Sequence, residues 1–199
     1  TEGDTVVLRI TTFSNQTYDS MRELLAEQVE EAGGIDNVNG LVLDLRNNPG
    51  GLLRQAILVS DAFLEAGEIV STRSRNPQDG ERYNANAGDL AEGLPIVVLI
   101  NGGSASAYYT PSGRSIQALG ISPDIIVEQP RRVEESTEEE EQGVFRSEAD
   151  LRGALSNDSL SEDEIRQIEA DRARAEDAAT LREEDYQLAY AIDILKGLS

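Results

Sequence analysis

The chain of 199 residues has no cysteine, no histidine and no tryptophan, and its one lysine is Lys196, near the C-terminal end. Without cysteine there is no disulfide and no thiol nucleophile. Without cysteine or histidine, a zinc site of the usual kind and a Ser-His-Asp triad are both excluded. The lack of cysteine is neutral on cellular compartment, because envelope and cytosolic proteins can both do without it.

Basic residues are scarce, since 17 Lys and Arg face 38 Asp and Glu, for a formal net charge of −21. Such a chain repels phosphate groups, so we expect neither nucleic acid nor an anionic membrane as a partner. The densest acidic run, Glu134–Glu141, is most simply a solvated linker. It lacks the turn glycine and the spaced ligands of a calcium loop. We therefore expect no metal site and no cofactor.

Long hydrophobic runs are also missing, so no stretch predicts a membrane span. The first residues, Thr1–Asp4, do not read as a signal peptide, and we expect them to come from the middle of a longer chain. The length allows one sizeable core.

Apolar runs predict five strands, at residues 6–10, 41–45, 69–73, 96–100 and 125–127. A helix is expected from Thr17 to Gly33, and another from Leu53 toward Gly67. Residues 76–93 read as a long surface connection with a short hairpin arm. Strands that alternate with helices through short joints predict right-handed crossovers, and hence an α/β fold with a mostly parallel sheet.

The C-terminal part has a different texture. Residues 1–128 are expected to form the core, 129–146 the acidic linker and 147–199 a helical tail. Ser161 and Glu164 form a capping box for a polar helix. A last amphipathic helix carries enough apolar surface to dock on the core or on a partner, so a homo-oligomer through residues 183–198 stays open.

Two strand ends carry residues suited to chemistry. The strand at 96–100 runs into Asn-Gly-Gly and then into two serines, Ser104 and Ser106. A buried strand that delivers a small hydroxyl to its carboxyl end is typical of a nucleophile or of a ligand-binding loop, although a plain polar turn fits as well. The strand at 41–45 leads to Gly50 and Gly51, where a backbone N–H can approach a reacting carbonyl unhindered.

Four stretches carry a family resemblance. They are Leu8–Phe13 (Leu-Arg-Ile-Thr-Thr-Phe), Leu41–Leu53 (Leu-Val-Leu-Asp-Leu-Arg-Asn-Asn-Pro-Gly-Gly-Leu-Leu), Asn101–Ala107 (Asn-Gly-Gly-Ser-Ala-Ser-Ala) and Tyr108–Gln117 (Tyr-Tyr-Thr-Pro-Ser-Gly-Arg-Ser-Ile-Gln), the last followed by Gly-Ile-Ser-Pro-Asp. In this order they resemble the carboxyl-terminal processing proteases, the tail-specific serine peptidases of family S41 from bacterial envelopes and plastids.

The resemblance implies a ClpP/crotonase-like core and a serine nucleophile with a lysine as general base. The nucleophile falls on Ser106, with Ser104 as its neighbour. The oxyanion hole falls on the amides of Gly51 and Ala107, with Gly50 as the alternate. It further implies a polypeptide substrate with a free C-terminus, and a location in the bacterial periplasm or cell envelope.

The sequence also departs from the family. There, a helix, a segment with Phe-Gly-Lys-Gly that carries the base, and a glutamine one turn later precede Tyr-Tyr-Thr-Pro-Ser-Gly. Here Tyr108 follows Ala107 directly. Lys196 lies beyond the linker and is not assigned as the base, and a PDZ domain is expected ahead of Thr1. Three explanations stay open: the sequence passes over a segment that the protein has, the segment was cut out, or this is a natural degenerate member that only binds.

We therefore expect a serine endopeptidase that cleaves C-terminal tails, with the chain as it stands close to inactive. Loss of a general base costs roughly two to four orders of magnitude in rate. Asp44, Asp61 and Asp124 are too weak as bases to replace it. The alternative is a non-catalytic peptide-binding or scaffold module on the same fold. A crotonase-like acyl-thioester enzyme is a third reading, which the acidic charge disfavours.

Overall fold

The computed structural model describes residues 1–71, 81–104, 123–128 and 162–198. The chain divides into two compact units: unit 1 comprises Thr1–Glu128 and Gln187–Ser199, and unit 2 comprises Gln129–Tyr186. The chain thus returns to unit 1 at Gln187, whereas the sequence grouped residues 147–199 as one tail. The linker at 129–146 and the expected helix start at Ser147 lie outside the described residues.

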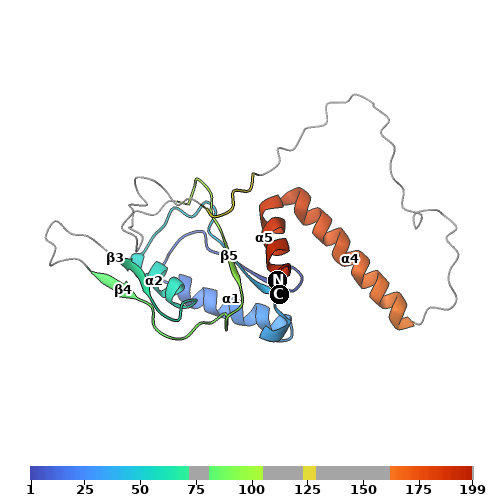
Figure 1. Ribbon diagram of the computed structural model, residues 1–199, viewed down its shortest axis with the longest axis horizontal. Coiled ribbons are helices and arrows are strands. Elements are labelled where there is room, and N and C mark those ends of the chain that lie inside the picture. The colour runs from blue at the N-terminus through green and yellow to red at the C-terminus, as the bar shows by residue number, and fades with distance from the viewer. Residues whose placement is uncertain (72–80, 105–122, 129–161, 199) are drawn as a thin grey trace, which may run out of the picture. The chain divides into compact units, whose positions relative to one another are not determined.

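Unit 1 is built on three parallel strands in the order β1-β2-β5 (Figure 1). They are β1 (Thr5–Arg9), β2 (Gly40–Asp44) and β5 (Ile96–Leu99). Leu41 of β2 lies opposite both Val6 and Ile96, so all three strands run in register. The mostly parallel α/β sheet is confirmed.

Helices supply the crossovers that parallel strands need. Helix α1 (Thr17–Glu31) and the short 3-10 helix η1 (Ile35–Asn37) connect β1 to β2, and α2 (Leu53–Asp61) follows β2. Both α-helices pack on one face of the sheet, because alternate strand residues turn their side chains to that face. The core cluster there is Val6, Leu8, Ile10, Met21, Leu25, Val38, Leu41, Val59, Ala62 and Ala91.

A side chain covers the free edge of β1. Gln28 of α1 accepts a 3.1 Å hydrogen bond from the N–H of Val7 through Oε1 and donates a 3.1 Å bond to the Val7 carbonyl through Nε2. Its carboxamide thereby takes the place of a neighbouring strand's peptide group. An edge closed in this way offers no template to another chain at this position.

The opposite face of the sheet carries helix α5 (Tyr186–Lys196). A Cβ built on Gly40 would lie 2.7 Å from Cδ2 of Leu195, so the helix rests directly on this strand position. Leu195 is fully buried, together with Ala189, Ala191 and Ile192. From Gln187 onward the apolar side of the last helix therefore packs on its own core. Tyr190 and Leu198 remain exposed, and a homo-oligomer through residues 183–198 stays a prediction.

Two further expectations meet the structure differently. Strand β3 (Glu68–Ser71) pairs with β4 (Arg82–Asn84) in an antiparallel ribbon, which agrees with a hairpin arm in this region. The expected strand at 125–127 is wrong, because these residues have no regular secondary structure. Ile126 there is 81% exposed, since an apolar run becomes a strand only where another strand meets its backbone groups.

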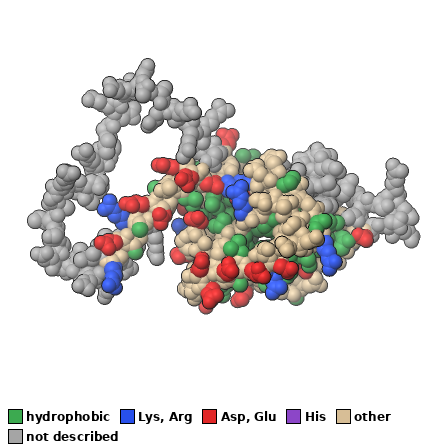
Figure 2. Space-filling model, turned by 180° about the vertical axis from the view of Figure 1, so that it is seen from behind, with side chains coloured by type: hydrophobic (Ala, Val, Ile, Leu, Met, Phe, Trp, Pro, Cys, Tyr) green, Lys and Arg blue, Asp and Glu red, His purple; other side chains and the backbone are tan. Residues whose placement is uncertain are grey.

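Unit 2 contributes helix α4 (Glu162–Glu184), in the region where the sequence predicted a polar helix. Its exposed ion pair, Arg172 Nε to Glu176 Oε1 at 3.0 Å, has the spacing that supports a solvated helix. Acidic side chains outnumber basic ones on the face shown in Figure 2, both over unit 1 and along α4. Among the described residues, no helix combines the length and hydrophobicity that a membrane span needs.

Candidate active site

Two segments leave the carboxyl edge of the sheet beside each other. The β2 loop, residues 45–52, follows β2, and the β5 turn, residues 100–104, follows β5. The two strands are hydrogen-bonded neighbours, with Asp44 opposite Leu99, so both segments start at the same level. In open parallel sheets, ligands and reacting groups gather at this edge.

Asn48 holds the β2 loop in shape from within. Its buried side chain donates a 2.8 Å hydrogen bond from Nδ2 to the carbonyl of Ile10 and accepts a 2.7 Å bond at Oδ1 from the N–H of Gly50. The first bond ties the loop to the end of the β1 segment, and the second fixes the bend that leads into the glycines. A buried carboxamide with both ends satisfied favours one loop conformation.

Gly50 is buried, and its backbone groups are already used. Its N–H donates to Asn48, while its carbonyl accepts from the N–H of Phe13 at 3.0 Å and from Oγ1 of Thr12 at 3.1 Å. An amide committed to an internal acceptor is not free to hold a substrate oxygen.

Gly51, the next residue, differs from Gly50 in its exposure and in the state of its N–H: it is exposed where Gly50 is buried. Its φ of +145° is a conformation that side chains rarely adopt, and a Cβ here would collide with the carbonyl oxygen of Phe13. Among the described residues, no group accepts a hydrogen bond from the N–H of Gly51. The loop therefore presents one exposed amide at the sheet edge, at a position that only glycine fits.

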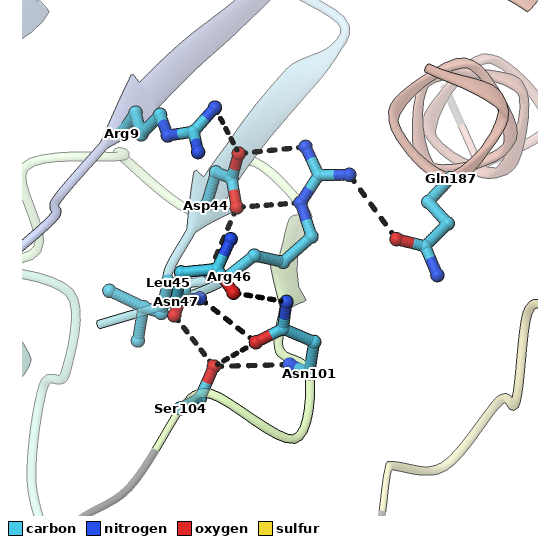
Figure 3. Close-up of polar contacts among 8 residues, drawn as sticks. All are labelled: Arg9, Asp44, Leu45, Arg46, Asn47, Asn101, Ser104 and Gln187. Atoms are coloured by element: carbon cyan, nitrogen blue, oxygen red, sulfur yellow. Dashed lines mark hydrogen bonds and ion pairs between the residues drawn. The ribbon is translucent and has the colours of Figure 1, made fainter. Parts of the chain in front are cut away.

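The β5 turn is closed by Ser104. Its Oγ accepts a 3.0 Å hydrogen bond from the N–H of Asn101 and donates a 2.7 Å bond to the carbonyl of Leu45 (Figure 3). Oγ also lies 3.3 Å from Oδ1 of Asn101, but the single hydroxyl hydrogen of this half-buried serine goes to the nearer acceptor, the main-chain carbonyl of the β2 loop. The hydroxyl has a structural function in this geometry.

Asn47 and Asn101 join the two segments side by side (Figure 3). The N–H of Asn47 donates to Oδ1 of Asn101 at 2.9 Å, and Nδ2 of Asn101 donates back to Oδ1 of Asn47 at 2.9 Å. Asn47 has a φ of +57°, in the left-handed region that asparagine tolerates better than most residues. We call these two residues the asparagine clamp.

A buried ion pair stands behind the loop. Nε and Nη2 of Arg46 donate to the two oxygens of Asp44 at 2.9 and 2.8 Å, and both side chains are at most 10% exposed. Gln187 of α5 accepts from Arg46 at 3.3 Å and donates to the carbonyl of Val127 at 2.8 Å. A carboxylate held by a bidentate arginine is not free to act as a base. The C-terminal helix is tied in this way to the base of the β2 loop.

Of the site residues that the sequence named, the structure describes Gly50, Gly51 and Ser104, and it brings them to the same sheet edge. Ser106 and Ala107 lie outside the described residues. Lys196 is exposed at the last turn of α5. In the described part of the chain, no group of three or more His, Cys, Asp or Glu side chains could hold a metal ion.

Sequence reasoning missed the residues that organise the site. The family motifs contain Asn48, the two residues of the asparagine clamp and the Arg46–Asp44 pair, but the sequence alone predicts no structural role for them. A signal was present, because asparagine directly after a buried strand is typical of a side chain that bonds to nearby main chain.

The model of peptidase family S41 matches residues 4–107, which include both segments of the site. The chain belongs to peptidase family S41. A carboxy-terminal-processing protease of Bartonella bacilliformis is 41% identical over 174 residues, which cover 65% of this chain and 40% of that protein. A carboxyl-terminal-processing protease of a Synechocystis species is 32% identical over 168 residues, covering 62% of this chain and 38% of that protein.

A solved structure of a photosystem II D1 C-terminal processing protease has the same fold. It matches with a TM-score of 0.51 and 24% sequence identity, over 60% of this chain and 41% of that one. This S41 chain thus spans about two fifths of the length of the Bartonella and Synechocystis relatives. The alignment with the Bartonella relative is 174 residues long, but it uses only 65% of the 199 residues of this chain. The relative therefore has some tens of residues within the matched stretch that this chain lacks.

Proposed function

We propose that this chain is the core of a serine endopeptidase that cleaves the C-terminal tails of proteins. The observation that carries the proposal is the exposed, unpaired amide of Gly51, at the same sheet edge as the turn that runs on toward Ser106. An amide without a partner among the described residues, in an exposed glycine beside the turn that leads to Ser106, suits an oxyanion hole.

In the proposed reaction, Oγ of Ser106 attacks the scissile carbonyl carbon while a lysine accepts the hydroxyl proton. The amides of Gly51 and Ala107 hold the negative oxygen of the tetrahedral intermediate. The C–N bond then breaks, the leaving amine takes the proton, and water hydrolyses the acyl-serine. This scheme follows the family resemblance, on a ClpP/crotonase-like core.

Two contacts support the choice among alternatives. Ser104 gives its hydroxyl hydrogen to the carbonyl of Leu45, which favours Ser106 over Ser104 as the nucleophile of the motif. Gly50 gives its N–H to Asn48, which favours Gly51 over Gly50 as the oxyanion donor. Both choices agree with the positions that the resemblance implied.

The lysine base is not assigned to a residue of this chain. The relatives carry residues within the matched stretch that this chain lacks, and we propose that the base belongs to that segment. The chain by itself should then be a slow nucleophile. The lack of lysine apart from Lys196 is also what favours the second candidate, a non-catalytic peptide-binding module.

The partner we propose is a polypeptide with a free C-terminus, in the bacterial periplasm or cell envelope. This follows from the family assignment together with the resemblance. A binding module on the same fold predicts that such a tail binds equally well to the Ser106→Ala variant.

The test is covalent labelling of the purified chain by a serine-directed fluorophosphonate, with and without added ethylamine as a substitute base. We expect slow labelling at Ser106 that neutral amine accelerates. The label should vanish in Ser106→Ala and persist in Ser104→Ala. No labelling with amine present, or label on another residue, would contradict the peptidase assignment.

A further inference from the structure

The asparagine clamp has a geometry that fixes which atom of each carboxamide faces the other. Oδ1 of Asn101 accepts from two backbone N–H groups, those of Asn47 at 2.9 Å and Gly103 at 3.0 Å. Main-chain N–H groups can only donate, so the oxygen must face them and Nδ2 must face Oδ1 of Asn47. The Asn101 carboxamide therefore both donates to and accepts from Asn47 of the β2 loop, and its oxygen also accepts from its own turn.

The clamp is also a close steric fit. A Cβ added to Gly103 would lie 2.8 Å from Oδ1 and 3.2 Å from Cα of Asn47, whereas a Cβ on Gly102 would meet nothing within 4 Å. One side of the β5 turn thus rests on Asn47 and the other is open to solvent. Figure 3 shows the turn and the loop joined by Asn101 above and by Ser104 below.

These contacts lie between the two halves of the proposed site. Asn47 stands four positions before Gly51 in the β2 loop, and Asn101 lies in the β5 turn, five positions before Ser106. We propose that Asn101 is a positioning residue, whose carboxamide sets the separation between the β5 turn and the β2 loop. Its effect on reactivity rests on the proposed function, while its effect on the spacing of the two segments does not.

Exposure makes this role separable from a structural one. Asn47 and Asn101 are both exposed, so water can replace the hydrogen bonds that a substitution removes. We expect the midpoint of urea unfolding to change little when the clamp is broken. Reactivity, in contrast, depends on where the attacking oxygen and the oxyanion donor stand, and a shift of about 1 Å can cost up to about 100-fold in rate.

The sharpest test compares two variants, each of which replaces the side-chain amide of one clamp residue by a carboxylate. Asn47→Asp keeps an acceptor for Nδ2 of Asn101, whereas Asn101→Asp sets a carboxylate against Oδ1 of Asn47. Both variants add one negative charge, so charge alone cannot separate them. We expect the rate of amine-assisted labelling to fall about 10- to 100-fold in Asn101→Asp. In Asn47→Asp the rate should stay within about threefold of the wild-type rate.

A second pair tests the steric fit without changing a polar group. Gly103→Ala should slow labelling as Asn101→Asp does, and Gly102→Ala should not. In nitrogen-15 NMR spectra of the whole chain, Asn101→Asp should move the amide signal of Asn47 in the β2 loop as well as the signals of the β5 turn. If its shifts stay within residues 100–104, the clamp proposal is overturned.

The two proposals fail in different ways. If the wild-type chain is not labelled but Asn101→Asp still moves the amide signal of Asn47, the clamp is supported and the peptidase assignment is contradicted. Equal labelling rates for Asn47→Asp and Asn101→Asp, with labelling of the wild type intact, contradict the clamp and support the assignment.

Discussion

The β2 loop and the β5 turn leave neighbouring strands at the same edge, yet they are held in different ways. The β2 loop is fixed from within and from β1, through the buried carboxamide of Asn48 and the close approach of Phe13 to Gly51. The β5 turn makes its outward bonds to the β2 loop, through Asn101 to Asn47 and through Ser104 to Leu45.

This difference makes the dependence one-sided. A defect in the β2 loop removes the surface on which the β5 turn rests, so both segments should change. A defect in the β5 turn removes bonds that the β2 loop does not need for its own shape. The part of the site that holds the oxyanion is thus the rigid reference, and the part that continues toward Ser106 is aligned to it.

The largest effect on stability is expected from Gly51→Ala, which disrupts the β2 loop. The new Cβ collides with the Phe13 carbonyl, a main-chain atom that cannot swing away, and φ is also unfavourable. We expect a loss of about 2–4 kcal/mol in the free energy of unfolding, measured by urea titration. Amide exchange should increase in both segments.

Gly102→Ala is the matched control, because it adds the same methyl group in open space. Its free energy of unfolding should stay within about 0.5 kcal/mol of the wild type. Equal losses in the two variants would show that the fit at Phe13 does not hold the β2 loop.

Asn48→Ala comes next. It leaves the buried Ile10 carbonyl and the Gly50 N–H without partners, which should cost about 1–3 kcal/mol. Hydrogen exchange should quicken at Gly50 and in the β5 turn as well. Asn37→Ala is the control: it removes one exposed hydrogen bond and should lower the free energy of unfolding far less. If hydrogen exchange in the β5 turn does not change in Asn48→Ala, the one-sided dependence is refuted.

Ser104→Ala probes the dependent side. It removes the bond to the Leu45 carbonyl and the acceptor for the Asn101 N–H, at a cost of about 1 kcal/mol. Exchange should quicken at Asn101 and stay unchanged at Gly50. Faster exchange at Gly50 would mean that the β2 loop also relies on the turn.

The smallest effect is expected away from both segments, at Asp61. Hydrogen bonds from the backbone and then the side chain of Asn86 lower its pKa below the usual 3.8. When the pKa of a carboxyl group is lower in the folded state than in the unfolded state, the ionised group stabilises the fold at pH values above its unfolded-state pKa. This stability is lost as the pH falls through the folded-state pKa. Between about pH 5 and pH 3, the wild type should therefore lose slightly more stability than Asp61→Asn. An identical pH dependence would show that Asn86 does not matter.

Much of the fold could be predicted, because its signals are local. The apolar runs at 6–10, 41–45 and 96–100 and the amphipathic helix from Thr17 report burial through their own periodicity. The run at 125–127 has the same composition and forms no strand, since pairing depends on a free sheet edge elsewhere in the chain.

The sequence by itself determined the family, the strand–helix order and the motif positions Gly50, Gly51, Ser104 and Ser106. Only the tertiary structure decided between neighbours of the same residue type. Gly50 is committed because its carbonyl accepts from Phe13 and its N–H donates to Asn48, and Ser104 is committed because Leu45 lies across the sheet edge. Partners so distant in the chain leave no local pattern, so which amide stays open can be read only from the folded molecule.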